Sequence, residues 1–574
     1  MKKILISALL IAGSIAGCND NLSPEAKKLS ENPKTVKFEN NDAAAGIVPR
    51  PAKFTVFNKP GFEISANTKI VYTDKNLKRV ADYLTQTLAK STGLSLKASL
   101  APKAAPGENT IFISVLNTGK NWKKSQSYIL DSTKKGVVIV GSDPAGAFYG
   151  AVSMLQLMPA EVFASKKQNQ KWVVKSALIS DQPSFEKIRG LHVDVSRHFR
   201  TKKEMFEIID HMAMHKLNTM QIHLTDDQGW RVEIKAYPKL TEIGSRGNRT
   251  LLDVRRKKYP AGPAKFYTQK DLKEIADYAR SRFIDIIPEI DMPGHMRAVI
   301  AAYPEMKAPT DRRRIPKVIR IDEKGVKFCK TVLKEVNDLL KPKYIHIGCD
   351  EVNLGSRPGV YTDKQITKFA ATMSEYILNE LKATPIAWDD ALMKGLNNKS
   401  TVTHWWRYGK VHWWRHLPMT ADQKIQKFNH PYIMSPAVYT YFDMKQLPRE
   451  PGGGWARPLS VAECYNWDPF LDLRNYDPKK RHLALGAVAC TWSEMMPTYN
   501  LFQERVFPRL AAHAENCWAP LKANGGNPLS WEKYRDTVLV PYQIKRYDAM
   551  GINYWSKKNP AKLKTLRSKK KKNG

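Results

Sequence analysis

The chain has 574 residues, of which 42% are hydrophobic, and a formal net charge of +38 at pH 7. This length and apolar content are ample for a large core and predict two to four domains. The chain has only six cysteines, without metal-like spacing, so neither a disulfide-built fold nor a cysteine metal site is expected. No nucleic-acid-binding motif accompanies the positive charge, so we expect no nucleic-acid partner. The excess of cations favours an anionic partner, such as a polysaccharide or a membrane surface, or serves solubility alone.

The N-terminus has the layout of a secretion signal. Two lysines precede an apolar run, 4–16, which is too short to span a bilayer and ends in small residues before Cys18. This layout predicts a bacterial lipoprotein signal, residues 1–18, in which Cys18 is lipidated and becomes the mature N-terminus; an ordinary cleaved signal with a chance cysteine is the alternative. Residues 19–48 are polar and predict a flexible tether. We therefore expect a protein of the bacterial cell envelope, anchored to a membrane and facing the periplasm or the cell surface.

Residues 49–183 mix the sequence patterns of strands and helices. Short runs with alternating hydrophobicity stand beside amphipathic runs with a helical period, which predicts a small α+β domain. The expected strands are 53–57, 69–72, 110–115 and 136–140, and the expected helices are 77–90 and 145–157.

From residue 184 to 530, short apolar strands alternate with amphipathic helices such as 202–215, 270–280 and 326–340. Eight such cycles predict an α/β fold, a (β/α)8 barrel with long loops. The competing doubly wound sheet would show a Gly-rich phosphate turn after its first strand, and none is present. The remaining segment, 531–574, carries a basic tail and fits no barrel element. The expected barrel strands are 190–195, 219–224, 284–290, 344–347, 385–388, 402–405, 432–435 and 486–489.

Polar and aromatic residues gather where these strands end, and active sites of barrel enzymes are built at that end. A single Asp there is more often a helix N-cap, and a single His is more often a core residue, but eight such clusters predict a shared pocket. Carboxylates accept hydrogen bonds from hydroxyl groups and Trp packs on the apolar face of a sugar ring, so the pocket suits a neutral, polyhydroxylated ligand. The clusters include Asp194, Arg197 and His198; 223–231; Glu289, Asp291 and 293–295; 346–351; 388–390; 404–406; 439–443; and 492–494.

These clusters resemble the motifs of glycoside hydrolase family 20, the β-N-acetylhexosaminidases. The motif His-x-Gly-x-Asp-Glu at 346–351 is the most specific of them, and the resemblance extends over about residues 50–520. It implies a barrel after a small α+β domain, and exo-acting hydrolysis of terminal β-linked N-acetylhexosamine from oligosaccharides or glycoconjugates. The matching segments are 189–191, 194–198, 223–231, 292–295, 346–351, 441–443, 465–469, 489–494 and 508–518.

The resemblance implies a retaining mechanism in which the substrate assists. The 2-acetamido oxygen attacks the anomeric carbon and forms an oxazolinium ion. Glu351 is then the acid that protonates the leaving oxygen and afterwards activates water, while Asp350 holds the acetamide N–H and balances the positive charge. His295 and Asp226 are expected to form a polar relay to Glu351, with Asp227 as the other candidate for the second position.

The resemblance also implies residues that bind the sugar. Arg189 is expected at the O3 and O4 hydroxyls, Tyr441 at the acetamide oxygen, Asp443 at a hydroxyl, and Glu494 at the O4/O6 edge. Three tryptophans are expected to wall the acetamide and the ring, with Trp406 as an alternative to the second: Trp388, Trp405 and Trp492. The motif 404–407 is repeated at 412–415, where Trp413 and Trp414 either extend the cleft or pack the loop.

Two other functions compete with this interpretation. A metal-dependent barrel hydrolase could use ligand-type side chains such as His223, His346 and Asp350, but no paired-His motif is present and we expect neither metal nor cofactor. A non-catalytic sugar-binding lipoprotein could share the fold, but a degenerate enzyme is not expected to keep both Asp350 and Glu351. Chitin oligomers, glycoprotein glycans, peptidoglycan fragments and sulfated glycosaminoglycans all remain candidate substrates.

Overall fold

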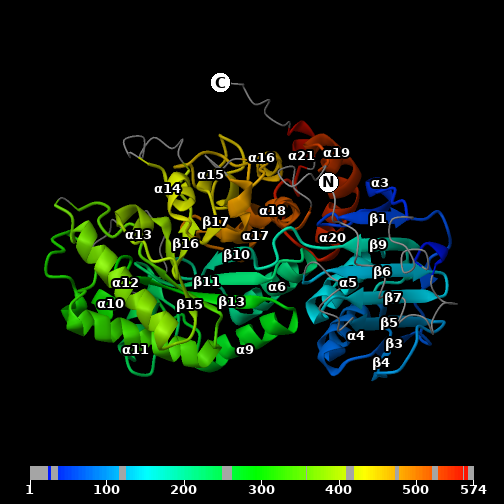
Figure 1. The fold of residues 1–574 in the computed structure, drawn as a ribbon, viewed down its shortest axis with the longest axis horizontal. Helices are drawn as coiled ribbons and strands as arrows, with labels where there is room; N and C mark the ends of the chain where they lie inside the picture. The colour runs from blue at the N-terminus through cyan, green and yellow to red at the C-terminus, as the bar shows by residue number, and fades with distance from the viewer. Residues whose placement is uncertain are drawn as a thin grey trace. The chain divides into compact units, whose positions relative to one another are not determined.

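We describe the fold from a computed structural model of the chain (Figure 1). The structure describes residues 23–26, 36–115, 125–247, 262–356, 358–408, 419–471, 477–519, 528–559 and 561–566. It divides into two compact units. One comprises 1–186, 213–216 and 514–574, and the other comprises 187–212 and 217–513.

The first unit is built on a seven-stranded mixed sheet with the order β1-β9-β6-β7-β5-β3-β4. The helices α4 (Lys78–Thr92) and α5 (Pro144–Gln156) pack on it through their buried faces. Asp143 caps α5 by accepting the N–H of Gly146, and a proline at the first turn of this helix is favoured because its missing N–H would have no partner there. The strands are β1 Lys53–Val56, β3 Lys69–Tyr72, β4 Lys97–Leu100, β5 Thr110–Val115, β6 Tyr128–Thr133, β7 Gly136–Gly141 and β9 Ala177–Asp181; a separate pair is β2 Phe62–Glu63 with β8 Val173–Val174.

The predicted small α+β domain is therefore present, and its seven-stranded sheet contains three strands that the sequence patterns did not reveal. All four residues of β4 are exposed at the edge of the sheet, so no apolar alternation marks the strand. The strand β6 is mostly buried but includes Asp131 and Ser132, whose polarity breaks the apolar run. The third, β9, includes the polar residues Ser180 and Asp181, which interrupt its apolar pattern in the same way.

The second unit is a closed parallel barrel, which confirms the predicted (β/α)8 fold. Eight strands follow one another around it in the order β10-β18-β17-β16-β15-β14-β13-β11, and pairing of β10 with β11 closes the ring. Apolar side chains from several strands meet in the interior, among them Ile188, Ile287, Ile386 and Val488. The strands are β10 Ile188–Asp194, β11 Thr219–Asp226, β13 Asp285–Met292, β14 Tyr344–Gly348, β15 Thr384–Trp388, β16 Val402–Trp405, β17 Tyr432–Met434 and β18 Ala484–Thr491, with β12 Gly229–Trp230 folded back on β11.

Helices surround the barrel, and their amphipathic patterns explain why they were predicted within a few residues of their ends (Figure 1). Thr268 caps α9 and Asp322 caps α11, and each accepts a backbone N–H of the first turn. The main helices are α6 Lys202–Met214, α9 Gln269–Ser281, α10 Arg297–Ala302, α11 Glu323–Leu340, α12 Asp363–Asn379, α13 Asp389–Lys394, α14 Ala421–Phe428, α15 Ala437–Thr440, α16 Val461–Tyr465, α17 Tyr499–Val506 and α18 Arg509–Trp518.

The end of the chain folds mainly as helix and groups with the first unit from residue 514 onward. Its helices are α19 Trp531–Tyr534, a π-helical segment Arg535–Gln543, α20 Ile544–Ala549 and α21 Ala561–Thr565. None of the helices in the described ranges is long and apolar enough to cross a bilayer. The predicted signal 1–18 lies outside the described residues, and so do residues 19–22 and 27–35 of the predicted tether and the last eight residues of the basic tail. The prediction of a flexible tether is wrong for residues 42–48, because α3 (Asp42–Ala45) forms there, Ile47 and Val48 are buried, and Val48 N–H donates to Gln156 Oε1 at 2.7 Å.

Candidate active site

A pocket opens at the C-terminal ends of the barrel strands, where the sequence placed its polar clusters. Carboxylates and aromatic rings dominate its lining, as a pocket for a polyhydroxylated ring requires. The lining residues are Arg197, His295, Asp350, Glu351, Trp388, Trp406, Tyr441, Asp443, Trp455, Trp492 and Glu494.

The turn after β14 carries the predicted acid pair into this pocket. Three of its four residues have positive backbone φ angles: Gly348 at 65°, Cys349 at 67° and Glu351 at 48°. A side chain on Gly348 would collide with Asp291 Oδ1 at 1.9 Å, so a glycine is required there. This left-handed path is uncommon for residues other than Gly, and at Glu351 it turns a catalytic-type carboxylate to the pocket side.

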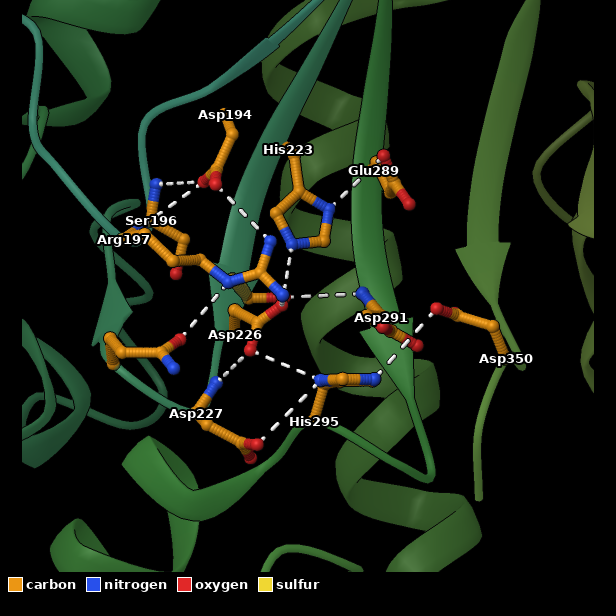
Figure 2. Close-up of polar contacts among 12 residues, drawn as sticks. Asp194, Ser196, Arg197, His223, Asp226, Asp227, Glu289, Asp291, His295 and Asp350 are labelled. Atoms are coloured by element: carbon orange, nitrogen blue, oxygen red, sulfur yellow. Dashed lines mark hydrogen bonds and ion pairs between the residues drawn. The ribbon is translucent and has the colours of Figure 1, made fainter. Parts of the chain in front are cut away.

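His295 connects the acid pair to a buried carboxylate, and Figure 2 shows its contacts with Asp226, Asp227 and Asp350. Its Nε2 lies 3.6 Å from Glu351 Oε2 and 3.8 Å from Asp350 Oδ2, while its Nδ1 lies 3.1 Å from Asp226 Oδ1 and 3.6 Å from Asp227 Oδ2. Asp226 is the closer partner and the more buried one, at 1% exposure, so the structure favours Asp226 over Asp227 for the second position of the relay.

Opposite charges alternate along this relay. Burial favours the neutral ring of His295, but the carboxylate of Asp226 outweighs it and raises the pKa of the ring well above its usual range. Burial likewise disfavours the Asp226 anion, yet the guanidinium of Arg197, 2.5 Å away, holds the pKa of that carboxyl well below its usual range. His295 is therefore a cation that faces Glu351.

The pKa values of Asp350 and Glu351 are shifted in opposite directions. Burial raises the pKa of Asp350 to about 6, and the neighbouring Asp390 and Glu351 add to this effect. Burial also acts to raise the pKa of Glu351, but the nearby cations, His295 foremost with its Nε2 3.6 Å away, together outweigh burial and lower that pKa. Among the described residues, Asp350 Oδ1 and His295 Nε2 have no hydrogen-bond partner although both are buried. Such groups are costly unless a ligand satisfies them.

A second polar layer lies beneath the relay, inside the barrel. His223 shares a hydrogen bond with Asp226 Oδ2 through Nε2 at 2.9 Å, and its Nδ1 lies 3.1 Å from Glu289 Oε2 as an ion-pair contact (Figure 2). His223 and Glu289 are paired residues on the adjacent strands β11 and β13, so their side chains meet in the interior. Glu289 Oε1 also accepts the indole N–H of Trp388 at 2.9 Å, which ties a pocket wall to this layer.

Aromatic rings close the pocket on three sides. Trp388 and Trp492 have centroids 5.8 Å apart, and Tyr441 lies 6.2 Å from Trp492 and stacks on Trp406 at 6.4 Å with an angle of 15°. Trp455 meets Trp406 edge-on at 5.9 Å and is 45% exposed, so it stands at the mouth. Trp388, Trp492 and Tyr441 thus lie where they were predicted.

The structure corrects the prediction for Arg189. This residue is the second of β10, at the N-terminal end of the barrel, and it is fully buried away from the pocket. Arg197, which follows the same strand at its C-terminal end, lines the pocket and pairs with Asp194, Asp226 and Glu494. The sequence offered a signal for this, because only residues that follow a strand can reach the site.

The structure also places Trp406, and not Trp405, in the pocket lining. Trp405 is the last residue of β16 and is 1% exposed, whereas Trp406 stacks beside Tyr441 and donates its indole N–H to Asp390 Oδ2 at 3.0 Å. Trp413 and Trp414 lie outside the described residues. Trp455 was missed because it sits in a Gly-rich loop where no periodicity marks it.

The remaining predicted ligands of the sugar are two further carboxyl groups in the pocket lining. Asp443 and Glu494 both line it, and Glu494 Oε1 lies 3.6 Å from the Arg197 guanidinium. Burial raises the pKa of Asp443 well above its usual range, and its Oδ1 is buried with no hydrogen-bond partner in the described part of the chain. These carboxyl groups offer acceptors and donors to sugar hydroxyls.

Three groups in the described residues have metal-ligand side chains within reach of one another: His192, His223 and Glu289; Asp226, Asp227 and His295; and Asp291, His295 and Asp350. Some of their atoms bond one another in the relay and in the layer beneath it, since His223 Nε2 and His295 Nδ1 both lie within hydrogen-bond distance of Asp226. These side chains form a connected polar network around Asp226.

Comparison with known proteins agrees with the resemblance seen in the sequence motifs. Residues 187–521 match the model of the glycosyl hydrolase family 20 catalytic domain, and residues 44–182 match domain 2 of that family. The chain is 34% identical to a beta-hexosaminidase of Porphyromonas gingivalis over 92% of this chain, and 28% identical to one of Akkermansia muciniphila over 74% of this chain and 85% of the relative.

Several solved structures are similar to this chain over most of its length and theirs. A family 20 beta-N-acetylhexosaminidase of Streptomyces coelicolor superposes with a TM-score of 0.77 at 27% identity, covering 90% of this chain and 98% of that one. A mutant beta-hexosaminidase of Streptomyces plicatus, in complex with the product GlcNAc, gives the same TM-score and identity, with 89% and 96% covered. The chain spans 66% of the Porphyromonas gingivalis relative and 64% of a Vibrio furnissii relative.

Proposed function

This chain belongs to glycosyl hydrolase family 20, and we propose that it removes terminal, non-reducing β-linked N-acetylhexosamine from oligosaccharides or glycoconjugates. One observation carries the proposal: Asp350 and Glu351 enter an aromatic pocket side by side, next to a cationic His295. Relatives named beta-hexosaminidase and a neighbour with GlcNAc bound support the substrate class.

The chemistry assigns different atoms of one sugar to the two acids. The acetamide oxygen attacks the anomeric carbon, and the bond to the leaving oxygen breaks as Glu351 protonates it. Asp350 Oδ1, which has no partner among the described residues, accepts the acetamide N–H and balances the positive oxazolinium ion. Glu351 then takes a proton from water as the water oxygen attacks the anomeric carbon. This attack opens the oxazolinium ring and restores the β configuration.

The surrounding residues hold the sugar and the acids. Trp388, Trp406 and Trp492 pack on the acetamide and the pyranose ring, and the Tyr441 hydroxyl donates to the acetamide oxygen. Arg197, Asp443 and Glu494 bind hydroxyl groups.

An aryl N-acetyl-β-glucosaminide assay, with and without exhaustive EDTA treatment, tests the proposal. We expect turnover that EDTA leaves unchanged, because the acid pair and the substrate's own acetamide supply the chemistry. Absence of turnover would indicate a sugar-binding protein on the same fold. Turnover that EDTA abolishes and Zn²⁺ restores would indicate a metal-dependent hydrolase that uses one of the His and Asp clusters.

We also propose that the mature chain is anchored in the bacterial cell envelope through lipid on Cys18. The basis is the sequence alone: two lysines, an apolar run and Ile15-Ala16-Gly17-Cys18. A single acyl chain gives only marginal membrane binding, so stable anchoring needs the several chains that a lipoprotein cysteine carries.

Cys18→Ser is expected to release the protein from membranes into the soluble fraction, because the thiol that receives the lipid is gone. Fractionation of expressing cells followed by immunodetection measures this. A wild-type chain that is fully soluble in the periplasm or the medium would contradict the anchor.

A further inference from the structure

A strongly basic loop lies beside the catalytic acid. Residues 307–321 contain six Lys or Arg and a single carboxylate, Asp311. Hydrogen bonds connect this loop to two segments of the site. Met296 N–H donates to Lys317 O at 2.9 Å, Ile319 N–H donates to Pro293 O at 3.0 Å, and the Arg313 guanidinium donates to Leu354 O at 2.9 Å. The loop thus borders the segment that carries His295 and the turn that carries Glu351.

The fully buried Asp311 gives this loop its shape. Its carboxylate accepts the Arg313 guanidinium at 2.8 Å through both oxygens, and it also accepts the backbone N–H of Lys317 at 3.0 Å and of Val318 at 3.1 Å. Arg320 is likewise neutralised by Asp322 at 2.7 Å. Asp311 and Asp322 are therefore already paired with neighbouring arginines.

Four cations of the loop form no ion pair in the described part of the chain: Lys307 at its start, and Arg312, Arg314 and Lys317. Arg312 and Arg314 are exposed and Lys317 is half-buried. The charge of Lys317 reaches the site itself, because it acts to lower the pKa of both Glu351 and His295. Like charges gathered on one loop repel one another, and an anion relieves that repulsion.

The position of the loop shows which part of a substrate it meets. In an exo-acting enzyme the terminal sugar fills the closed pocket, and the leaving oxygen lies at the acid. Glu351 is the most exposed member of the relay, with 34% of its side chain accessible, so the leaving sugar extends outward past Glu351. The loop borders that exit.

Building on the proposed function, we propose that Arg312, Arg314 and Lys317 form a binding site for an anionic group on the sugar that follows the cleaved bond. A uronate carboxylate or a sulfate ester supplies this chemistry, and Arg matches either one with paired N–H donors. The preferred substrate is then an N-acetylhexosamine linked to an acidic sugar, as in glycosaminoglycan-type chains, rather than a neutral chitin oligomer.

The test compares kcat/KM for three substrates with the same terminal sugar: N,N′-diacetylchitobiose, a GlcNAc-β-1,4-glucuronate oligosaccharide and a GlcNAc-β-galactose carrying a 6-sulfate. The wild type is expected to favour at least one acidic substrate, and the variant R312Q/R314Q/K317Q to reduce the acidic-to-neutral ratio by about tenfold, as three exposed ion contacts allow. Raising the salt concentration from about 50 to about 300 mM should reduce the wild-type ratio in the same direction.

A matched control removes the same charge from the opposite end of the barrel. Lys341, Lys382 and Lys399 are exposed, form no ion pair in the described part of the chain, and precede β14, β15 and β16. The variant K341Q/K382Q/K399Q should keep the wild-type ratio. The carboxylate and sulfate arms identify which anion the loop selects.

The outcomes separate the inference from the function on which it rests. Normal turnover of the aryl glycoside with a ratio that R312Q/R314Q/K317Q does not change would overturn the loop site alone. Absence of turnover on every substrate would overturn both. Loss of binding to phosphatidylglycerol vesicles in this variant, without a change in the ratio, would assign the charge to a membrane surface and likewise overturn the inference.

Discussion

Replacement of Glu351 by Gln is expected to lower the rate on an unactivated disaccharide by about 10²–10⁴-fold, the usual contribution of a placed proton donor. The amide keeps the size of the side chain but cannot transfer a proton to the leaving oxygen. An aryl substrate with a good leaving group needs less protonation, so its glycosylation step should suffer less. Steady-state kinetics on both substrates measure the difference.

Glu375→Gln provides a matched control, because Glu375 is exposed on α12 and outside the pocket. The same Glu-to-Gln change there should leave both rates at the wild-type level. Near-normal turnover of the disaccharide by the Glu351 variant would exclude this residue as the acid. In that case the carboxyl groups of Asp443 and Glu494 would be the next candidates in the pocket.

The barrel was predictable because its determinants are local. Each strand is a short apolar run between amphipathic helices, and this alternation is visible without any knowledge of contacts. The acid pair was predictable for a related reason, since a residue directly after a parallel strand must lie at the C-terminal end of the sheet. Asp350 and Glu351 follow β14 in this way.

What the sequence could not supply was the choice between neighbours. Trp405 and Trp406 are adjacent, and the point at which β16 ends separates them. Trp405 is the last residue of the strand and is buried, whereas Trp406 follows the strand and faces the pocket. Arg189 lies at the start of β10 and Arg197 follows its end, and the resemblance alone led to the wrong arginine. The contact between His223 and Glu289 depends on the register of β11 against β13, which no local pattern determines.

Proton placement links the site's electrostatics to its mechanism. In the free protein, Asp350 has the raised pKa of about 6 and the pKa of Glu351 is lowered, so Asp350 binds a proton first as the pH falls. Substrate-assisted catalysis needs the reverse, an Asp350 anion and a protonated Glu351. A bound acetamide N–H stabilises the Asp350 anion, and a leaving sugar that covers Glu351 removes water from it and raises its pKa.

Asp350→Asn is therefore expected to damage kcat more than KM. Asn can hydrogen-bond to the acetamide but cannot supply the negative charge, and that charge matters most as the oxazolinium ion forms. Because the pKa of Asp350 is raised, its anion predominates in the free protein only above about pH 6, where the lowered pKa of Glu351 leaves that acid without its proton. The reactive pair holds a single proton, so kcat/KM should fall as the pH rises above about 6, and in the Asn variant this alkaline limb should move to the lower pKa of Glu351.

The substrate change that matches this mutation should be at least as damaging. A 2-hydroxy glucoside has no acetamide, so it offers no nucleophile to the anomeric carbon, and no carboxylate of the pocket takes that role in the proposed mechanism. A thiazoline analogue of the bicyclic intermediate should inhibit. Since two inversions occur at one carbon, the sugar first released from the 2-acetamido substrate should keep the β configuration, which NMR of the anomeric proton detects before mutarotation. An α product, or comparable rates on the two substrates, would exclude substrate assistance and leave a mechanism in which two carboxyl groups of the protein do all the work.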